Sequence, residues 1–195
     1  MTAGPDEPRL TPLPPKEWPP EMRDAMAALR VSNPRHPFPP RDDSRPKALN
    51  ALGTLALHPE LARAFHTFNG HILFSTTLSP RQRELLVLRV ATVRHCEYEW
   101  RQHVVLAGDA GLTPDDITRV VDGPGAPGWT PLDGAMVAAV DELLGDARIT
   151  DVTWRALMAE LDEQQVMDLV FTVGAYDVLA MAFRSFGVPI DDDLL

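Results

Sequence analysis

Apolar residues recur at helical spacing through most of the chain after residue 45. Leu132, Met136, Val140 and Leu143, for example, lie three or four positions apart and therefore share one face of a helix. No stretch alternates polar and apolar residues as a half-buried strand does, so the pattern predicts an all-α protein. The expected helices lie near residues 46–57, 59–74, 80–94, 96–110, 114–121, 131–144, 151–160 and 163–186.

Local sequence signals mark several helix ends. Ser79, Pro80 and Gln82 fit the N-cap, first and third positions of a capping box, and Thr113 and Thr130 precede proline in the same way. An N-cap side chain satisfies backbone N–H groups that have no partner within the first turn. The predicted helix ends are glycines, which adopt the left-handed conformation easily: Gly111, Gly145 and Gly187.

Two of the expected helices are unusually apolar. Helix 80–94 contains "ELLVLRVATV", which is apolar on almost every side, so we expect protein all around it and Glu84 at least partly inside. Residues 166–183 are apolar enough to suggest a membrane span, but Asp168 and Asp177 interrupt them. We interpret this segment as a core helix and expect no membrane partner.

Most of the 19 prolines of the chain lie near its N-terminus. Because proline lacks an N–H donor and fixes φ, we expect residues 1–44 to form an extended arm, with at most one short helix in "EMRDAMAALR". Trp18 and Phe38 indicate that the arm lies over a surface, for instance that of a neighbouring subunit. Residues 45–190 would then form a single helical domain.

The chain is acidic, with 28 acidic and 18 basic residues and a formal net charge of −10. This charge gives no electrostatic reason to expect nucleic acid or an anionic membrane as a partner, so a small molecule or a protein fits better. The single cysteine, Cys96, cannot form an internal disulfide, and the N-terminal sequence has neither the basic nor the apolar region of a signal peptide. We therefore expect a cytoplasmic protein.

Candidate chemistry gathers in the stretch "CEYEWRQH", residues 96–103. If these residues belong to one helix, Cys96, Glu99, Trp100 and His103 share a face, and Glu84 faces them from the preceding helix. Glu99 and His103 are direct neighbours at i and i+4, whereas about 10 Å of axial rise separates Cys96 from His103. The expected site is a carboxylate–imidazole pair for proton transfer. The alternative is an ordinary exposed helix pair beside a small core cysteine.

Other side chains are weaker candidates. Trp100 and Tyr98 could line a substrate pocket, and His71 could form part of a pocket wall or face solvent. Tyr176 is a polar group inside an apolar helix and needs a partner. The set of Glu99, His103 and Cys96 lacks a clear fourth ligand, so no metal site is expected.

Residues 78–117, "LSPRQRELLVLRVATVRHCEYEWRQHVVLAGDAGLTPDDI", resemble the carboxymuconolactone decarboxylase family, which includes the alkyl hydroperoxidase D (AhpD) group. The resemblance, looser from about residue 45 to 187, implies an AhpD-like helical bundle and a homo-oligomer such as a trimer, hexamer or dimer. The AhpD group has the pattern Glu, eleven residues, Cys-x-x-Cys, three residues, His. Glu84, Cys96 and His103 match this pattern, but Glu99 replaces the second cysteine, so a two-cysteine peroxidase cycle is not available.

The sequence "EYEW" followed by His103 is more similar to the decarboxylase branch, whose members use no metal or organic cofactor and act on a lactone that carries a carboxylate. The leading hypothesis is a cofactor-independent lyase or isomerase with His103 as acid/base, Glu99 and Glu84 as its partners, and Cys96 in the pocket. A second hypothesis is a one-cysteine, peroxiredoxin-like hydroperoxidase in which Cys96 is oxidised to sulfenic acid. The third is a non-enzymatic helical assembly module.

Overall fold

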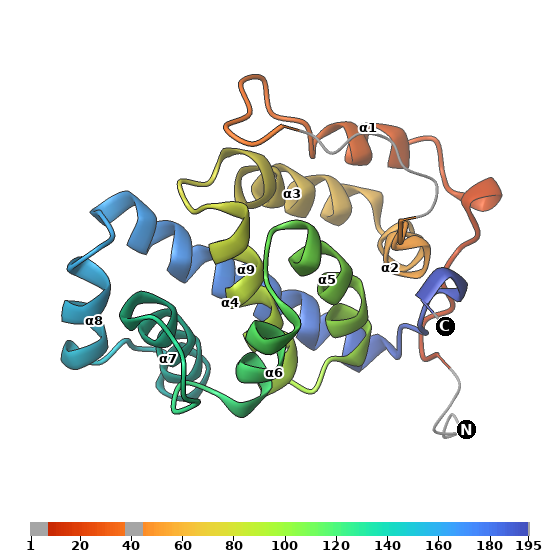
Figure 1. Ribbon diagram of the computed structural model, residues 1–195. Coiled ribbons are helices and arrows are strands. Elements are labelled where there is room, and N and C mark those ends of the chain that lie inside the picture. The colour runs from red at the N-terminus through yellow and green to blue at the C-terminus, as the bar shows by residue number, and fades with distance from the viewer. Residues whose placement is uncertain (1–7, 38–44, 195) are drawn as a thin grey trace. The chain divides into compact units, whose positions relative to one another are not determined.

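The computed structural model describes residues 8–37 and 45–194 (Figure 1), and within these ranges every regular element is a helix, which confirms the predicted all-α class. Two compact units result: residues 77–181, and residues 1–76 together with 182–195. The helices are α1 (Met22–Ala27), α2 (Leu49–Leu55), α3 (Pro59–Gly70), α4 (Pro80–Val93), α5 (Glu97–Asp109), α6 (Pro114–Asp122), α7 (Pro131–Asp146), α8 (Asp151–Met158) and α9 (Glu163–Phe186), with short helical turns at Pro15–Glu17, His71–Ser75 and Asp192–Leu194.

Helix α4 is the central element of unit 77–181. It packs against α5, α6 and α7, and its residues from Glu84 to Leu88 are all buried. The prediction that this helix is surrounded by protein is confirmed, and so is the burial of Glu84, whose side chain is 0% exposed. A carboxyl group inside such a helix requires polar partners, because burying it without them is costly.

The predicted helix starts are confirmed by their caps. The Ser79 side chain accepts from the Gln82 N–H at 3.2 Å, and the Gln82 side chain accepts from the Ser79 N–H at 2.9 Å, which completes the capping box. Gly111 has a φ of +95°, as expected of a residue that follows a helix. The prediction for Gly145 is wrong, because α7 continues through it to Asp146 and ends at Ala147, which adopts the left-handed conformation itself with a φ of 55°.

The N-terminal segment belongs to the other unit, and its described part covers that unit's own helices. The short helix expected in "EMRDAMAALR" is present as α1, which packs against α3. Met22 and Ala25 of α1 join Ala56 and Ala62 in a small apolar cluster against which Trp18 packs. The arm therefore lies over a surface of its own chain, as far as residues 8–37 show; Phe38 lies outside the described residues.

Helix α9 is long and apolar enough to cross a membrane by length and composition alone, but half of its most apolar window is buried inside the protein. Both aspartates that interrupt it have partners within unit 77–181. Asp168 accepts from the Thr77 N–H at 2.6 Å, and Asp177 pairs with Arg94 at 2.5 Å. These contacts agree with the interpretation of α9 as a core helix.

Candidate functional site

The site forms where α4 and α5 pack together. Glu84 on α4 and His103 on α5 are hydrogen-bonded, with 2.7 Å between the glutamate Oε2 and the imidazole Nδ1. A carboxylate can only accept, so Nδ1 carries the proton and Nε2 is left to accept or pass on another proton. The His103 side chain is 12% exposed, so the ring reaches the edge of the buried region.

Glu84 is held in its ionised form by two neighbours. Burial alone would raise the pKa of its carboxyl, but the imidazole of His103 and the guanidinium of Arg83 outweigh burial, so the pKa of Glu84 is lowered. Arg83 donates to the second oxygen, Oε1, from Nε at 3.1 Å and from Nη2 at 2.9 Å. Sequence analysis missed Arg83, because it is next to Glu84 in the chain and belongs to no recognisable spacing pattern.

Glu99 is not the partner of His103, which corrects the expected pair. Glu99 is 1% exposed, and neither of its carboxyl oxygens has a hydrogen-bond partner within the described residues. Burial, with a smaller contribution from the negative charge of Asp177, raises the pKa of Glu99 well above its ordinary value. Helical spacing predicts Glu99 as the partner of His103. The carboxylate that is hydrogen-bonded to the imidazole is instead that of Glu84 on α4.

Tyr176 on α9 completes the group. Its ring lies edge-on to the imidazole of His103, with 5.0 Å between ring centroids and an interplanar angle of 89°. Burial raises the pKa of the Tyr176 hydroxyl, and the negative charge of Glu84 raises it further, although Arg83 acts in the opposite direction. The hydroxyl therefore stays neutral.

Cys96 lies apart from His103, on the rim of a separate cavity. It is the N-cap residue of α5, with φ −94° and ψ 88°, so the spacing argument that placed it on one helix face with His103 does not apply. The chain reaches it through His95, a non-glycine residue with a φ of 51° that ends α4 where glycine is common. Cys96 is 1% exposed.

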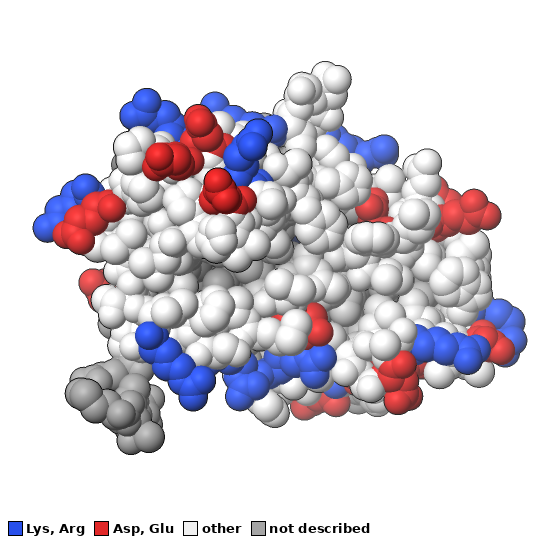
Figure 2. Space-filling model, turned by 180° about the vertical axis from the view of Figure 1, so that it is seen from behind, with Lys and Arg blue, Asp and Glu red and all other residues white. Residues whose placement is uncertain are grey.

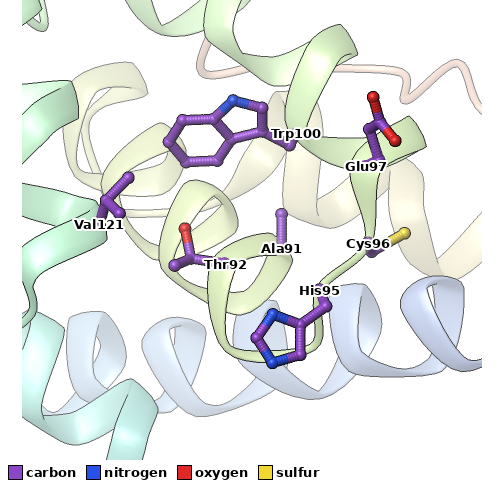
Figure 3. A pocket seen from close by; sticks show the side chains of 7 residues that line it. All are labelled: Ala91, Thr92, His95, Cys96, Glu97, Trp100 and Val121. Atoms are coloured by element: carbon purple, nitrogen blue, oxygen red, sulfur yellow. The ribbon is translucent and has the colours of Figure 1, made fainter.

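This cavity has a volume of about 300 Å³ (Figure 3). Trp100 forms one wall, as sequence analysis proposed, but His103 and Glu99 do not line the cavity. In Figure 3 the sulfur of Cys96 points away from Trp100 and Val121. The lining residues are Ala91, Thr92, His95, Cys96, Glu97, Trp100 and Val121.

The remaining candidate site residues do not lie together at one site. Tyr98 is 4% exposed and its hydroxyl is 3.5 Å from the side-chain nitrogen of Gln102, so it lies among the packed residues of α5. His71 is exposed and belongs to the other unit, at the start of a π-helical turn. Within residues 8–37 and 45–194, no group of three or more His, Cys, Asp or Glu side chains is arranged to hold a metal ion.

The arginines close to the site in sequence are all engaged with carboxylates. Arg89 and Asp141 form a fork-shaped contact, with distances of 2.6 and 2.7 Å, that leaves neither group available to a ligand without breaking it. The other pairs are Arg81 with Asp133, Arg94 with Asp177 and Arg101 with Glu97.

Comparison with solved structures shows the fold. An AhpD antioxidant-defence candidate from Agrobacterium tumefaciens superposes with a TM-score of 0.66 at 19% identity, covering 70% of this chain and 94% of that one. A peroxidase-related protein from Ralstonia eutropha JMP134 with an AhpD core has a TM-score of 0.67 at 18% identity, covering 74% of this chain and 78% of that one. The debrominase Bmp8 has a TM-score of 0.71 at 12% identity, covering 94% of this chain and 92% of that one.

Sequence comparison adds the family. No curated protein sequence matches the chain significantly. Residues 59–142, which contain Glu84, Cys96, Glu99 and His103, match the profile of the carboxymuconolactone decarboxylase family. This match over part of the chain, together with the AhpD-like fold of the structural neighbours, supports similarity to the carboxymuconolactone decarboxylase/AhpD-like superfamily.

Proposed function

We propose that this chain is a cofactor-independent acid/base enzyme that decarboxylates, or moves a proton on, a small lactone or enol-type carboxylate. One observation carries the proposal: two buried glutamates on neighbouring helices have pKa values shifted in opposite directions. The pKa of Glu84 is lowered by His103 and Arg83 despite burial, and burial with Asp177 raises that of Glu99. Titratable groups whose surroundings push their pKa values apart are the usual mark of an acid and a base that act together.

Each group would have a distinct role. Glu84 orients the imidazole through Nδ1 and faces the positive charge that forms when Nε2 takes a proton. Glu99, whose pKa is raised by burial and by Asp177, is the carboxyl that would hold and donate a proton. His103 lies one turn further along α5 and is partly exposed, so it is the member that exchanges protons with solvent.

The decarboxylation balances with these groups alone. The bond between the substrate carbon and its carboxylate breaks, carbon dioxide leaves, and the electron pair remains on the substrate as an enolate. The carbon then takes the proton of the Glu99 carboxyl, and Glu99 regains a proton from water through His103. Each turnover thus consumes one proton and releases one molecule of carbon dioxide.

The test compares three variants on a panel of small lactones that carry a carboxylate, by release of carbon dioxide and by uptake of solvent deuterium into the product. Glu99→Gln keeps size and polarity but cannot donate the carboxyl proton, so kcat should fall by about 10² or more. The kcat of His103→Ala should fall by a similar factor, and Cys96→Ser should keep most of the activity. Full activity in Glu99→Gln, with loss in Cys96→Ser, would overturn the proposal.

A second candidate function is thiol chemistry at Cys96, either as a one-cysteine hydroperoxidase or as a dehalogenase. The cavity beside Cys96 and Trp100 favours it. A cysteine-to-alanine variant of the debrominase Bmp8 is known in complex with 2,3,4-tribromopyrrole, and that protein has the same fold with a TM-score of 0.70. Here Cys96→Ser should abolish turnover of an organic hydroperoxide or a halogenated pyrrole, and Glu99→Gln should not.

A further inference from the structure

The cavity between α4, α5 and the end of α6 (Figure 3) is not used by the proposed acid/base chemistry, because none of the three side chains of that chemistry lines it. Its volume of about 300 Å³ is at the lower end of the about 300–1,000 Å³ typical of small-molecule sites. Arg89 on α4 donates to the carbonyl oxygens of Val120 and Val121 at 2.8 and 3.2 Å, which holds the end of α6 against α4. The walls of the cavity are therefore in place before a ligand binds.

Trp100 gives the cavity an aromatic wall. The indoles of two other tryptophans are held within the chain: Trp18 donates to the carbonyl oxygen of Leu13 at 2.8 Å, and Trp129 donates to that of Gly123 at 3.0 Å. Within the described part of the chain, the indole of Trp100 has no comparable hydrogen bond and no aromatic ring against it. A planar aromatic molecule in the cavity would supply such a contact, by stacking on the indole or meeting it edge-on.

His95 forms another wall, at a cost to the backbone. Its N–H donates to the Thr92 carbonyl oxygen at 3.1 Å, and the N–H of Cys96 donates to the Ala91 carbonyl oxygen at 2.9 Å. This pair of hydrogen bonds is the Schellman motif, whose left-handed residue is usually glycine. His95 adopts that conformation with a φ of 51°, although a Cβ is unfavourable there. The helix end does not need an imidazole, and residues held in such conformations cluster at ligand sites.

The polar groups of the cavity wall are mainly hydrogen-bond acceptors. The Thr92 hydroxyl donates to the Leu88 carbonyl oxygen at 2.8 Å, so its own oxygen has only lone pairs to offer a ligand. Glu97 adds a carboxylate, and the contacts from Arg101, at 3.1 and 2.8 Å, both reach its Oε1. A ligand that matches these acceptors carries an N–H or O–H donor.

An anionic ligand fits the cavity poorly. No lysine or arginine lines it, and the carboxylate of Glu97 would repel a second carboxylate. The face shown in Figure 2 is mostly uncharged, with charged side chains of both signs toward its margins, so that face presents no single basic patch to steer an anion toward the chain. The ligand of the cavity is therefore of a different class from the carboxylate substrate of the proposed function.

We propose that this cavity binds a small, uncharged, planar aromatic molecule that packs against Trp100 and donates an N–H or O–H hydrogen bond to Thr92. In Figure 3 the indole of Trp100 and the imidazole of His95 lie on opposite sides of the cavity with Thr92 between them, so a ring in the cavity lies among all three. Binding requires neither the acid/base step nor a reaction at Cys96, whose sulfur points away from Trp100. The inference therefore stands independently of both candidate functions.

The first experiment compares three ligands on the full chain by isothermal titration calorimetry. Indole has the proposed ring and an N–H donor, benzofuran has the same shape with an oxygen in place of the N–H, and indole carboxylate adds a negative charge. Indole should bind about fivefold more tightly than benzofuran, because it makes one more hydrogen bond. It should bind at least about tenfold more tightly than indole carboxylate, because Glu97 repels the added charge. No binding of indole, or binding of either analogue as tight as that of indole, would overturn the proposal.

The second experiment measures the Kd of indole for variants of the cavity wall. Trp100→Leu removes the aromatic wall and should weaken binding about tenfold. The matched control is Trp154→Leu on α8, which should leave the Kd unchanged because Trp154 is 46% exposed and does not line the cavity. Equal Kd values for the two leucine variants would contradict the proposal.

His95→Gly separates a ligand contact from a role in ending α4. Glycine fits the left-handed position, so the midpoint of thermal unfolding should not fall. Indole binding should nevertheless weaken about fivefold, because the imidazole is lost from the cavity wall. Unchanged binding in His95→Gly would show that His95 serves only the helix end, and this result would contradict the proposed site.

Discussion

Glu84 and Glu99 lie in two regions of the same helix pair, and both are fully buried, yet their surroundings differ in kind. The region around Glu84 supplies a guanidinium and an imidazole within 3.1 Å of its oxygens. The region around Glu99 supplies no hydrogen bond within the described residues and has the charge of Asp177 nearby. Burial pushes both pKa values upward, and only opposite charges at contact distance reverse this effect.

The comparison teaches that burial alone does not determine what a carboxyl group can do. Glu84 acts as an anion that organises its neighbours, and its removal should disturb them. Glu99 is a buried carboxyl with a raised pKa and no hydrogen-bond partner within the described residues, so its removal should stabilise the fold. The two residues should therefore respond to substitution with opposite signs.

The largest effect is expected at Glu84. Glu84→Gln removes the negative charge from between Arg83 and His103, and breaking a buried ion pair by removing one partner costs about 3–5 kcal/mol. Urea unfolding followed by circular dichroism should show this loss. The control is Glu97→Gln, because Glu97 is 67% exposed at its side chain and pairs with Arg101 on the surface. A loss in Glu84→Gln no larger than in the control would show that the two regions do not differ.

A smaller effect, of opposite sign, is expected at Glu99. Glu99→Leu replaces a buried carboxyl that has no hydrogen-bond partner, and removing such a group recovers about 1–3 kcal/mol of desolvation free energy. The same urea titration should therefore give a gain in stability, with loss of the proposed activity. Glu99→Gln, which keeps the buried polar atoms, is the matched control and should give little gain. A loss as large as that of Glu84→Gln would mean that Glu99 is ionised and paired.

Sequence alone predicts the helices of this fold well, because their starts are decided locally. Ser79 and Thr113 are confirmed N-caps, and both capping boxes are complete. Gly145 shows the limit of the same signal: a glycine permits a helix to end but does not force it, and α7 continues past Gly145 to Asp146.

The site is predicted less completely, because its key contact crosses between helices. Spacing within α5 correctly makes Glu99 and His103 neighbours on the helix, but it cannot tell which carboxylate reaches the imidazole. The answer depends on how α4 places Glu84, and Arg83 beside it, against α5. Helical spacing also misplaces Cys96, because His95 turns the chain and leaves Cys96 outside the regular helix.

The smallest effect lies in the pH dependence of stability, and here too the two glutamates should act in opposite directions. The pKa of Glu99 is raised in the folded state, so above its ordinary value of 4.5 the folded chain still holds a proton that the unfolded chain has lost. Stability contributed by this proton is complete below pH 4.5 and is lost as pH rises through the folded-state pKa, by at most about 1.4 kcal/mol per pH unit. The pKa of Glu84 is lowered, so its contribution is present above 4.5 and is lost as pH falls through the folded-state value.

The free energy of unfolding, measured from pH 3 to 8 in wild type and both glutamine variants, separates the two contributions. Glu99→Gln should remove part of the decline toward high pH, because glutamine cannot release a proton. Glu84→Gln should instead remove part of the decline toward low pH. Profiles that run parallel to the wild type would contradict the assigned protonation states, whereas a change on the same side in both variants would mean that the glutamates titrate as one coupled pair through His103.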